Sequence, residues 1–384
     1  MGPAQHDIAI IGGGPVGAAL ALALAQNGHS LLLIEATPAP ATPNDPRTLA
    51  LSAGSRLILE RIGVWPVLAK PTPIRRIHVS QRGAFGRAVM TAAEAGVPAL
   101  GYVVSYASLQ RAFSESLESS RAVTAMAGAR VTRVHSSGDH VEIDIAQGGV
   151  NVQAKLAVIA DGSAAAVEPA EIEVRDYRQS AVIANARASK TPDGTAFERF
   201  TPDGPLALLP HGDGYALIWT LAADRALAMS RATDAIFLES LQQAFGDRVG
   251  TFVSAGPRTL LPLRLRVSRR PTRARQLLIG NAAQALHPVA GQGLNLGLRD
   301  AWQLSEVIGE TSADPGAPEI VDAYTHARRN DRRNGVILTD ALVRIFSNDI
   351  TPLSWLRGCG LTLLDSVPQA KRAFMRQTMF GSAI

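Results

Sequence analysis

The sequence predicts an α/β fold with three parts: a parallel sheet built on a βαβ unit, an inserted domain of mixed β-sheet, and a helical C-terminal region. Three observations predict it. Near the N-terminus a short β-branched run, a glycine-rich turn and an Ala/Leu-rich segment follow one another. From about residue 167 to 263 strands and turns dominate, and from 318 to 384 the pattern is mostly helical. The 384 residues provide room for roughly two or three domains around a sizeable core.

The N-terminal segment predicts one βαβ unit. The apolar, β-branched run at Asp7–Ile11 is typical of a buried parallel strand. A glycine turn separates it from an Ala/Leu-rich helix over about 16–26, which Asn27-Gly28 ends as a left-handed C-cap. The next strand covers 30–34 and is closed by Glu35.

Beyond this unit, strands and helices continue to alternate. The expected elements are a proline-rich loop over 37–46, helices over 52–62 and 105–119, strands over 74–80, 88–91, 129–134, 141–146, 156–160 and 277–280, a helix from about 294, and a Gly/Pro linker at 313–318. We therefore expect residues 1–70, 98–166 and 264–312 to form the parallel-sheet domain, 71–97 and 167–263 the inserted domain, and 318–384 the helical region.

Composition narrows the classes of protein and site. With 46% hydrophobic and 18% charged residues, the chain should be globular rather than disordered. Cys359 is the only cysteine, which excludes an internal disulfide framework, a thiolate zinc cluster and a dithiol redox centre. We expect no metal site. The net charge of +5 is mild and the arginines form no patch interleaved with aromatic residues, so we expect no nucleic-acid partner.

The N-terminal apolar stretch superficially resembles a signal peptide. It lacks a basic leading region, because the first arginine is Arg47, and the glycine turn interrupts it. We therefore assign this stretch to the fold. No window contains the roughly 18 uninterrupted apolar residues that a membrane span requires. A cytoplasmic location in a reducing compartment is the expectation.

The turn after the first strand carries a dinucleotide-binding pattern, Gly12-x-Gly14-x-x-Gly17. Gly12 permits a tight turn, Gly14 lets a pyrophosphate approach the backbone, and Gly17 lets helix and strand pack closely. The helix start supplies free N–H groups, and Glu35, 18 positions after Gly17, can accept from ribose hydroxyls. The position of the pattern between a strand and a helix predicts dinucleotide binding.

A second constellation occupies residues 277–300. A buried strand is followed by a turn, then by a loop that contains Pro288, Gly291 and Gly293, and then by a helix that begins near Leu294. A helix start of this kind presents unpaired N–H groups to an anion. It suits the negative charge that a reduced flavin carries near N1 and the C2 carbonyl.

Together these segments resemble the FAD-dependent aromatic hydroxylases of the p-hydroxybenzoate hydroxylase type. Within that superfamily the chain is similar to the ubiquinone-biosynthesis hydroxylases, which carry Gly-Asn, as at Gly280-Asn281, where others carry Gly-Asp. The run Gly-Asn-Ala-Ala-Gln most resembles the 2-polyprenyl-6-methoxyphenol hydroxylase branch, which oxidises the ring carbon para to the phenol oxygen. The likeness extends from about residue 7 to beyond 340, and further matching segments lie at 45–52, 62–65, 79–83, 181–185, 196–201, 204–210 and 243–246.

The resemblance implies a fold with a Rossmann-like FAD-binding domain and a set of FAD-binding residues. These are Gly12, Gly14, Gly17 and Glu35 for the ADP half, Arg47 for the flavin side, Arg111 for the pyrophosphate, Val131 for adenine through its main chain, Asp161 and Gly162 of a DG motif shared with the NAD(P)H site, Gly280 and Asn281 for the ribityl–pyrophosphate stretch, and Pro288, Gly291, Gly293, Leu294 and Asn295 around the isoalloxazine. The wider class continues the DG motif to Ser-x-Val-Arg, whereas Glu168 follows Val167 here.

The resemblance also implies the chemistry. NAD(P)H would reduce FAD as a transient reductant, oxygen would add at flavin C4a, and the resulting hydroperoxide would oxidise a ring carbon made electron-rich by the phenol. The sequence identifies no catalytic residue. His287 lies beside the flavin loop and is interpreted as a structural loop residue.

The expected substrate is a polyprenyl phenol. The segment 353–380 mixes apolar residues with Arg357, Lys371, Arg372 and Arg376. It could be a basic peripheral surface on the inner membrane, or a helix that packs on the FAD domain or on a second subunit of a homo-oligomer. The sequence does not decide whether the protein binds partners from a ubiquinone-biosynthesis complex. It also leaves three alternatives for the activity: a sibling hydroxylase acting at another ring position, a flavin oxidoreductase without oxygen insertion, and a non-catalytic scaffold flavoprotein.

Overall fold

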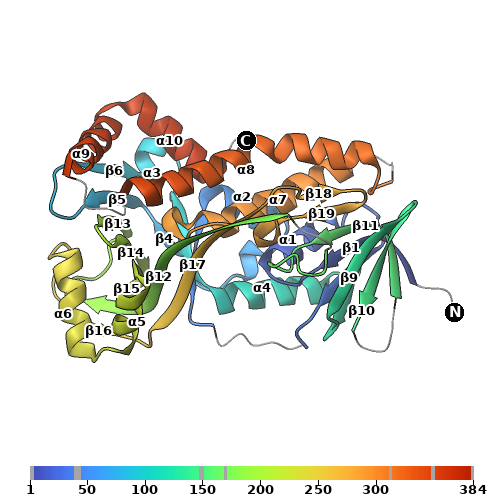
Figure 1. Ribbon diagram of the computed structural model, residues 1–384, viewed down its shortest axis with the longest axis horizontal. Coiled ribbons are helices and arrows are strands. Elements are labelled where there is room, and N and C mark those ends of the chain that lie inside the picture. The colour runs from blue at the N-terminus through green and yellow to red at the C-terminus, as the bar shows by residue number, and fades with distance from the viewer. Residues whose placement is uncertain are drawn as a thin grey trace.

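The computed structural model describes residues 4–38, 45–146, 151–167, 171–310, 314–346 and 351–381. Figure 1 shows an elongated molecule with two groups of strands at its two ends and the long helix α8 running along one side of both. The helices α9 and α10 lie at the end of the molecule away from β9 and β10.

The first sheet is the predicted parallel one. Its order is β18-β19-β11-β1-β2-β8, with β19, β11, β1, β2 and β8 parallel and the antiparallel hairpin β9–β10 added on β11. Its strands are β1 (Ala4–Ile11), β2 (Leu31–Glu35), β8 (Val123–Ala127), β9 (Val131–Ser137), β10 (His140–Ile145), β11 (Asn151–Ile159), β18 (Thr272–Arg273) and β19 (Gln276–Leu278).

Both faces of this sheet are buried, as its continuous apolar runs predict. Ile8 and Ile10 pack in one core cluster with three helices, whereas Ala9 and Ile11 pack on the opposite face with the β9–β10 hairpin. The three helices are α1 (Pro15–Leu24), α4 (Tyr106–Ser119) and α7 (Gln292–Gly309). Because successive side chains point to opposite faces, one strand serves two cores.

The second sheet has the order β20-β17-β12-β15-β14-β13-β5-β6, with β16 paired to β12. All of its pairs are antiparallel except β13–β5. The helices α5 (Ala223–Arg231) and α6 (Asp234–Phe245) cover one face around Trp219 and Phe237. The strands are β5 (Arg76–Gln81), β6 (Arg87–Thr91), β12 (Ile172–Ala188), β13 (Thr195–Thr201), β14 (Gly204–His211), β15 (Gly214–Ala222), β16 (Phe252–Ala255), β17 (Thr259–Ser268) and β20 (Gln284–Ala285).

A small third sheet and the C-terminal helices connect these two layers. The third sheet has the order β3-β7-β4, with β3 (Thr48–Ser52), β4 (Thr72–Ile74) and β7 (Gly101–Ser105). The remaining helices are α2 (Ala53–Arg61), α3 (Ala92–Ala95), α8 (Pro318–Phe346), α9 (Thr351–Ser366), α10 (Pro368–Phe380) and the 3₁₀ turns η1 (Trp65–Val67), η2 (Gly280–Ala282) and η3 (Val289–Gly291). The domain boundaries given above stay predictions.

The C-terminal region is helical, as its pattern predicts. α8 packs on α7, α9 lies against β5 and β6, and α10 packs on α2 and α3. In the described part of the chain, no helix combines the length and the apolar character needed to cross a membrane.

Candidate functional site

The turn between β1 and α1 forms the first part of the site. Gly12 has a φ of +106°, and a Cβ there would lie 2.7 Å from the backbone nitrogen of Asp161. A Cβ on Gly17 would lie 1.9 Å from the carbonyl oxygen of Gly12, so a glycine is required at both positions. Gly14 is the N-cap of α1, where no described side chain caps the helix and no described atom lies within 4 Å of the Cβ position. The helix start therefore offers its N–H groups to an anion.

Two side chains hold this turn in place. The carboxylate of Glu35, at the end of β2, accepts hydrogen bonds from the backbone N–H groups of Gly13 (2.6 Å) and Thr37 (2.8 Å). Gln110 of α4 donates from Nε2 to the carbonyl oxygen of Gly13 (3.3 Å), and its buried Oε1 has no partner among the described residues. Gln110 was not among the predicted residues. The neighbouring Arg111 was predicted to meet the pyrophosphate. Its side chain is exposed and does not line the cavity described below.

The start of α7 forms the second part of the site. Gly291 caps the helix with a φ of +60°, and no side chain in the described residues caps it. The Asn295 side chain, one turn on, accepts hydrogen bonds from the Ser52 N–H (2.8 Å) and the Ser55 hydroxyl (2.7 Å). It donates to the carbonyl oxygens of Ala50 (2.9 Å) and Gly291 (2.7 Å). All four hydrogen-bonding positions of this amide are therefore used to fasten β3 to the loop and helix.

The end of β11 forms a third edge of the site. Asp161 accepts hydrogen bonds from the backbone N–H groups of Ser163 (2.9 Å) and Ala164 (2.8 Å) and from the Ser163 hydroxyl (2.8 Å). Gly162 has a φ of +77°, and its Cβ position lies 3.9 Å from the Cβ of Asn281. The turn after β11 and the turn after β19 thus meet at one edge of the parallel sheet, where ligands of open α/β sheets bind.

Gly280 lies behind this edge rather than on it. Its φ is +57°, and a Cβ would come within 3.2 Å of the methyl groups of Val16. Its N–H donates to the buried carboxylate of Asp300 (3.1 Å), which also accepts from Gln284 (2.8 Å) and from Nε of Arg328 (2.8 Å). Gly280 therefore serves the close packing of the η2 turn against α1.

Of two further predicted residues, one lines the cavity described below and the other does not. Arg47 lies on the cavity, where it forms an ion pair with Asp45 (2.6 Å) and its guanidinium stacks over the Tyr106 ring at 4.8 Å. Val131 is half-buried in the β9–β10 hairpin and does not line the cavity. Glu168, the departure from the DG motif, lies outside the described residues.

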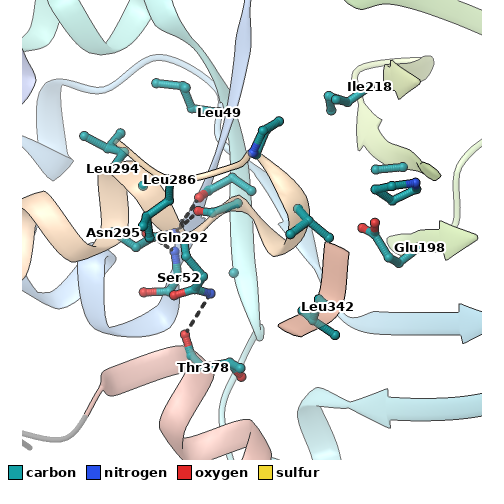
Figure 2. Close-up of a pocket in the computed structure, with 18 of the residues that line it drawn as sticks. Leu49, Ser52, Glu198, Ile218, Leu286, Gln292, Leu294, Asn295, Leu342 and Thr378 are labelled. Atoms are coloured by element: carbon teal, nitrogen blue, oxygen red, sulfur yellow. Dashed lines mark hydrogen bonds between the residues drawn. The ribbon is translucent and has the colours of Figure 1, made fainter. Parts of the chain in front are cut away.

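These edges enclose one end of a cavity of about 1030 Å³. Four of the predicted cofactor residues lie away from it, namely Gly17, Arg111, Val131 and Gly280, and the others line it. Figure 2 shows Leu294 and Asn295 at the loop–helix junction on one side of the cavity, with Glu198 and Ile218 from the second sheet on the other.

The other end of the cavity is apolar. It lies between the uncovered face of the second sheet and the helices α8, α9 and α10, and its walls include Ile77, Val79, Leu209, Ile218, Leu342, Phe346, Leu353, Leu361, Met375 and Met379. On the sheet face the polar lining residues are Thr220 and Glu198. Burial raises the pKa of the Glu198 carboxyl group to about 7.

His287 is buried and does not line the cavity. Its Nδ1 accepts a hydrogen bond from the N–H of Val289 (3.1 Å), and the Tyr177 ring meets it edge-on with the centroids 5.4 Å apart. Burial lowers the pKa of His287 to about 4, so the ring is neutral near pH 7. These contacts support the structural interpretation of this residue.

The comparisons with known proteins agree on one family. The FAD-binding domain family matches residues 5–336. Ubiquinone hydroxylase UbiL of Rhodospirillum rubrum is 36% identical, covering 97% of this chain and 89% of that protein. The 3-demethoxyubiquinol 3-hydroxylase of Escherichia coli is 33% identical, with 97% and 98% covered. The chain belongs to this FAD-binding family. It is an FAD-dependent monooxygenase, and its relatives include ubiquinone-biosynthesis hydroxylases.

Solved structures identify the fold as that of the p-hydroxybenzoate hydroxylase type. The p-nitrophenol 4-monooxygenase of Pseudomonas putida superposes with a TM-score of 0.81 at 17% identity, covering 100% of both chains. HpxO of Klebsiella pneumoniae, solved with FAD and uric acid, gives a TM-score of 0.74 at 19% identity, with 97% of each chain covered.

The geometry of this chain fits FAD. The α1 start is uncapped and open at Gly14, so nothing described fills the position of a pyrophosphate. The Glu35 carboxylate accepts two backbone hydrogen bonds and retains acceptor capacity for a ribose hydroxyl. The second helix start, at Gly291, lies on the same cavity. Two anion-binding helix ends in one cavity suit a cofactor with a diphosphate and an anionic reduced ring.

Proposed function

We propose that this FAD-dependent monooxygenase hydroxylates a polyprenyl methoxyphenol in ubiquinone biosynthesis, with NAD(P)H as reductant and O₂ as the oxygen source. The observation that carries the proposal is that the cavity joins a cradle for FAD to an apolar chamber. The names of the relatives place them in the same pathway.

FAD, when bound, supplies the redox chemistry by taking electrons from NAD(P)H and activating oxygen. Gly12, Gly14 and Glu35 would hold its ADP half, and the backbone around Gly291 and Gly293 would hold the ring. The residues of the chain orient the cofactor and the substrate and exclude water. Water exclusion is supported by the apolar side chains that the second sheet and α8 place along the chamber.

The apolar chamber supports a substrate with a hydrocarbon tail. Aliphatic and methionine side chains line it, including Leu209 of β14, Leu342 of α8, Leu361 of α9 and Met375 of α10. Burying each CH₂ of a prenyl chain there would contribute about 0.8 kcal/mol. A small polar phenol would leave most of this surface in contact with water.

We propose para hydroxylation, because Gly280–Gln284 matches the branch that oxidises that carbon. Gln284 itself donates to Asp300, and its Oε1 accepts from Arg332 (2.6 Å), so it serves the buried network and does not line the cavity. Gln284 therefore identifies the para-hydroxylating branch in the sequence but does not contact the substrate. A sibling position on the ring stays the alternative, and the name of the Escherichia coli relative supports it.

We also propose a peripheral membrane contact through α9. Trp355, Leu356 and Leu363 of this helix are 64%, 67% and 65% exposed, and Leu356 also lines the cavity. Exposed tryptophan and leucine on one helix are typical of interfacial binding, and a mouth at the bilayer would admit a lipid-soluble substrate. Flotation with anionic vesicles, compared between the wild type and W355S/L356S, tests it. A second subunit or a pathway partner on α9 would instead give a complex in gel filtration without vesicle binding.

The experiment that tests the activity is product analysis. The FAD-loaded protein is incubated with NADH or NADPH, ¹⁸O₂ and a short-chain 2-prenyl-6-methoxyphenol, and the product is analysed by mass spectrometry and NMR. One ¹⁸O para to the phenol oxygen is the expected result. An ortho product would assign the protein to a sibling hydroxylase that acts at another ring position, and not to the para-hydroxylating branch. Flavin reduction without oxygen insertion would support an oxidoreductase or scaffold and overturn the proposal.

A further inference from the structure

Glu198 lies within an apolar row of the cavity wall. It belongs to β13, which pairs with β5 and β14. The register places Val79 on one side of it and Ala207 on the other, and Ile218 follows Ala207 on β15. All four residues line the cavity, and Figure 2 shows Glu198 and Ile218 on its wall. A single carboxyl group thus interrupts a hydrophobic surface.

This carboxyl group has no partner within the described residues. No hydrogen bond or ion pair joins it to another described residue, and its Oε1 is buried and unsatisfied. Burial alone accounts for the rise in its pKa, with no contribution from a neighbouring charge. An unpaired carboxyl with a buried oxygen destabilises the folded protein, so a group of this kind at a cavity is a candidate for function.

Two charged residues on elements that line the cavity bond to other residues. Arg199, its neighbour on β13, donates to the Ala244 carbonyl oxygen (3.2 Å). Asp340 of α8 accepts from Arg175 (2.7 Å) and from the Tyr177 hydroxyl (3.0 Å). The other titratable or charged side chains on the packed elements and on the nearby wall are Arg76 and His78 of β5, His211 of β14, Tyr215 of β15, Arg344 of α8, and Arg357, Cys359 and Asp365 of α9. None of them contributes to the pKa of Glu198.

We propose that Glu198 is a catalytic base that contacts the ring hydroxyl of the substrate. Its carboxylate accepts a hydrogen bond from the phenol O–H and thereby orients the ring across the cavity from the α7 start. This inference rests on the proposed function, because it deepens the assignment of a phenol as substrate. A carboxylate in an apolar wall that has no partner among the described residues is stabilised by a hydrogen-bond donor, and a phenol is one.

Glu198 takes up one proton during this reaction and returns it. As the ring carbon is oxidised, the phenol O–H bond breaks, its electron pair forms the carbonyl, and the proton goes to Glu198. The C–H bond at the oxidised carbon then breaks, its proton leaves to solvent, and its electron pair restores the aromatic ring. The oxygen recovers the proton from Glu198, which returns to its starting state. A base whose pKa lies near the working pH suits such a cycle.

The test is a binding titration that does not depend on turnover. Oxidised holoenzyme is titrated with a short-chain 2-prenyl-6-methoxyphenol or with its methyl ether between pH 6 and 8.5, and the flavin absorbance reports binding. For the wild type, the Kd of the phenol should fall about fivefold as Glu198 ionises, because a hydrogen bond to a charged acceptor is stronger. The Kd of the ether should not change with pH.

E198Q should remove this pH dependence and lower turnover about 100-fold with FAD content unchanged. E198L is a second variant, in case the glutamine amide of E198Q disturbs the apolar wall. It should likewise remove the pH dependence and lower turnover. E239Q, on the exposed Glu239 of α6, is the matched control and should keep the wild-type profile. E198Q that retains the pH-dependent binding, or a wild type that binds phenol and ether with one profile, would overturn the assignment. Failure of the proposed function is seen separately, as absence of ¹⁸O in the wild-type product.

Discussion

At the residue scale, Glu198 illustrates how an active-site group opposes stability. Its ordinary pKa of 4.5 rises to about 7 in the folded protein. Between these values the folded state binds more protons than the unfolded state, so stability falls as the pH rises from 4.5 to 7 and stays reduced above it. We therefore expect E198Q to stabilise the protein by about 1–3 kcal/mol at pH 8 and by little near pH 4.5. Urea unfolding at both values measures the difference. An equal effect at the two pH values would contradict the assigned burial.

Asn295 makes a second residue-scale case. Its amide both accepts and donates, and an aspartate cannot donate to the carbonyl oxygens of Ala50 and Gly291. N295D should therefore lower the free energy of unfolding by about 2–4 kcal/mol and weaken FAD binding, because β3 and the α7 start separate. Urea unfolding and FAD fluorescence titration measure the two effects. N330D, on the exposed Asn330 of α8, is the matched control, since this residue lies away from the cavity and forms no such bridge. Equal losses in both variants would contradict this role.

Sequence reasoning worked well for residues whose role is local. The positive φ of Gly12 and the approach of a Gly17 Cβ to the Gly12 carbonyl oxygen both arise within one turn, so the spacing alone predicts a glycine at each position. Gln110 and Glu198 were not predicted, because their roles depend on tertiary contacts. Alternation along 196–201 places Glu198 with Ala196 and Phe200 on one face, but only the pairing with β5 and β14 shows that this face is apolar and lines a cavity.

At the element scale, buried charges join α7 to α8. Arg328 binds Asp300 (2.8 Å) and Asp331 (2.7 Å), and Arg299 binds Asp331 (2.7 Å). Burial raises the pKa of Asp331, but the two guanidinium groups outweigh it and the net shift is downward. R328M would leave two buried carboxylates without this cation and should cost about 3–5 kcal/mol in urea unfolding. R329M, one residue on and exposed, should change stability by less than about 0.5 kcal/mol. A small loss in R328M would contradict the arrangement.

Elements with strong periodicity were predicted, and their contacts were not. The helix predicted from about 294 begins at Gln292, and the predicted strand at 88–91 is β6, Arg87–Thr91. What the pattern could not supply is the partner of each amphipathic face. The C-terminal segment was left open between a membrane, the FAD domain and a second subunit. In the structure α10 packs on α2 and α3, while α9 keeps its exposed apolar side chains.

At the scale of the whole molecule, the cavity depends on all three sheets and the C-terminal helices. Its walls include Gly12 beside the first sheet, Ala50 of the third, Ile218 of the second and Met375 of α10. A ligand that contacts several layers binds only when they are assembled, so it stabilises the folded state as a unit. The prediction is that FAD raises Tm in a concentration-dependent way. At 100 times Kd the gain is about 2.7 kcal/mol, or about 3 °C for a chain of this size.

Gly14 supplies the control for this prediction. Its φ is −64° and nothing described lies within 4 Å of its Cβ position, so an aspartate fits there without strain. As an N-cap, aspartate should stabilise α1 by a few tenths of a kcal/mol relative to glycine. It also places a negative charge where the pyrophosphate would bind. G14D should therefore keep or slightly raise the Tm of the apoprotein and lose the FAD-dependent increase. Differential scanning calorimetry with and without FAD measures both, and an undiminished shift in G14D would place the diphosphate elsewhere in the cavity.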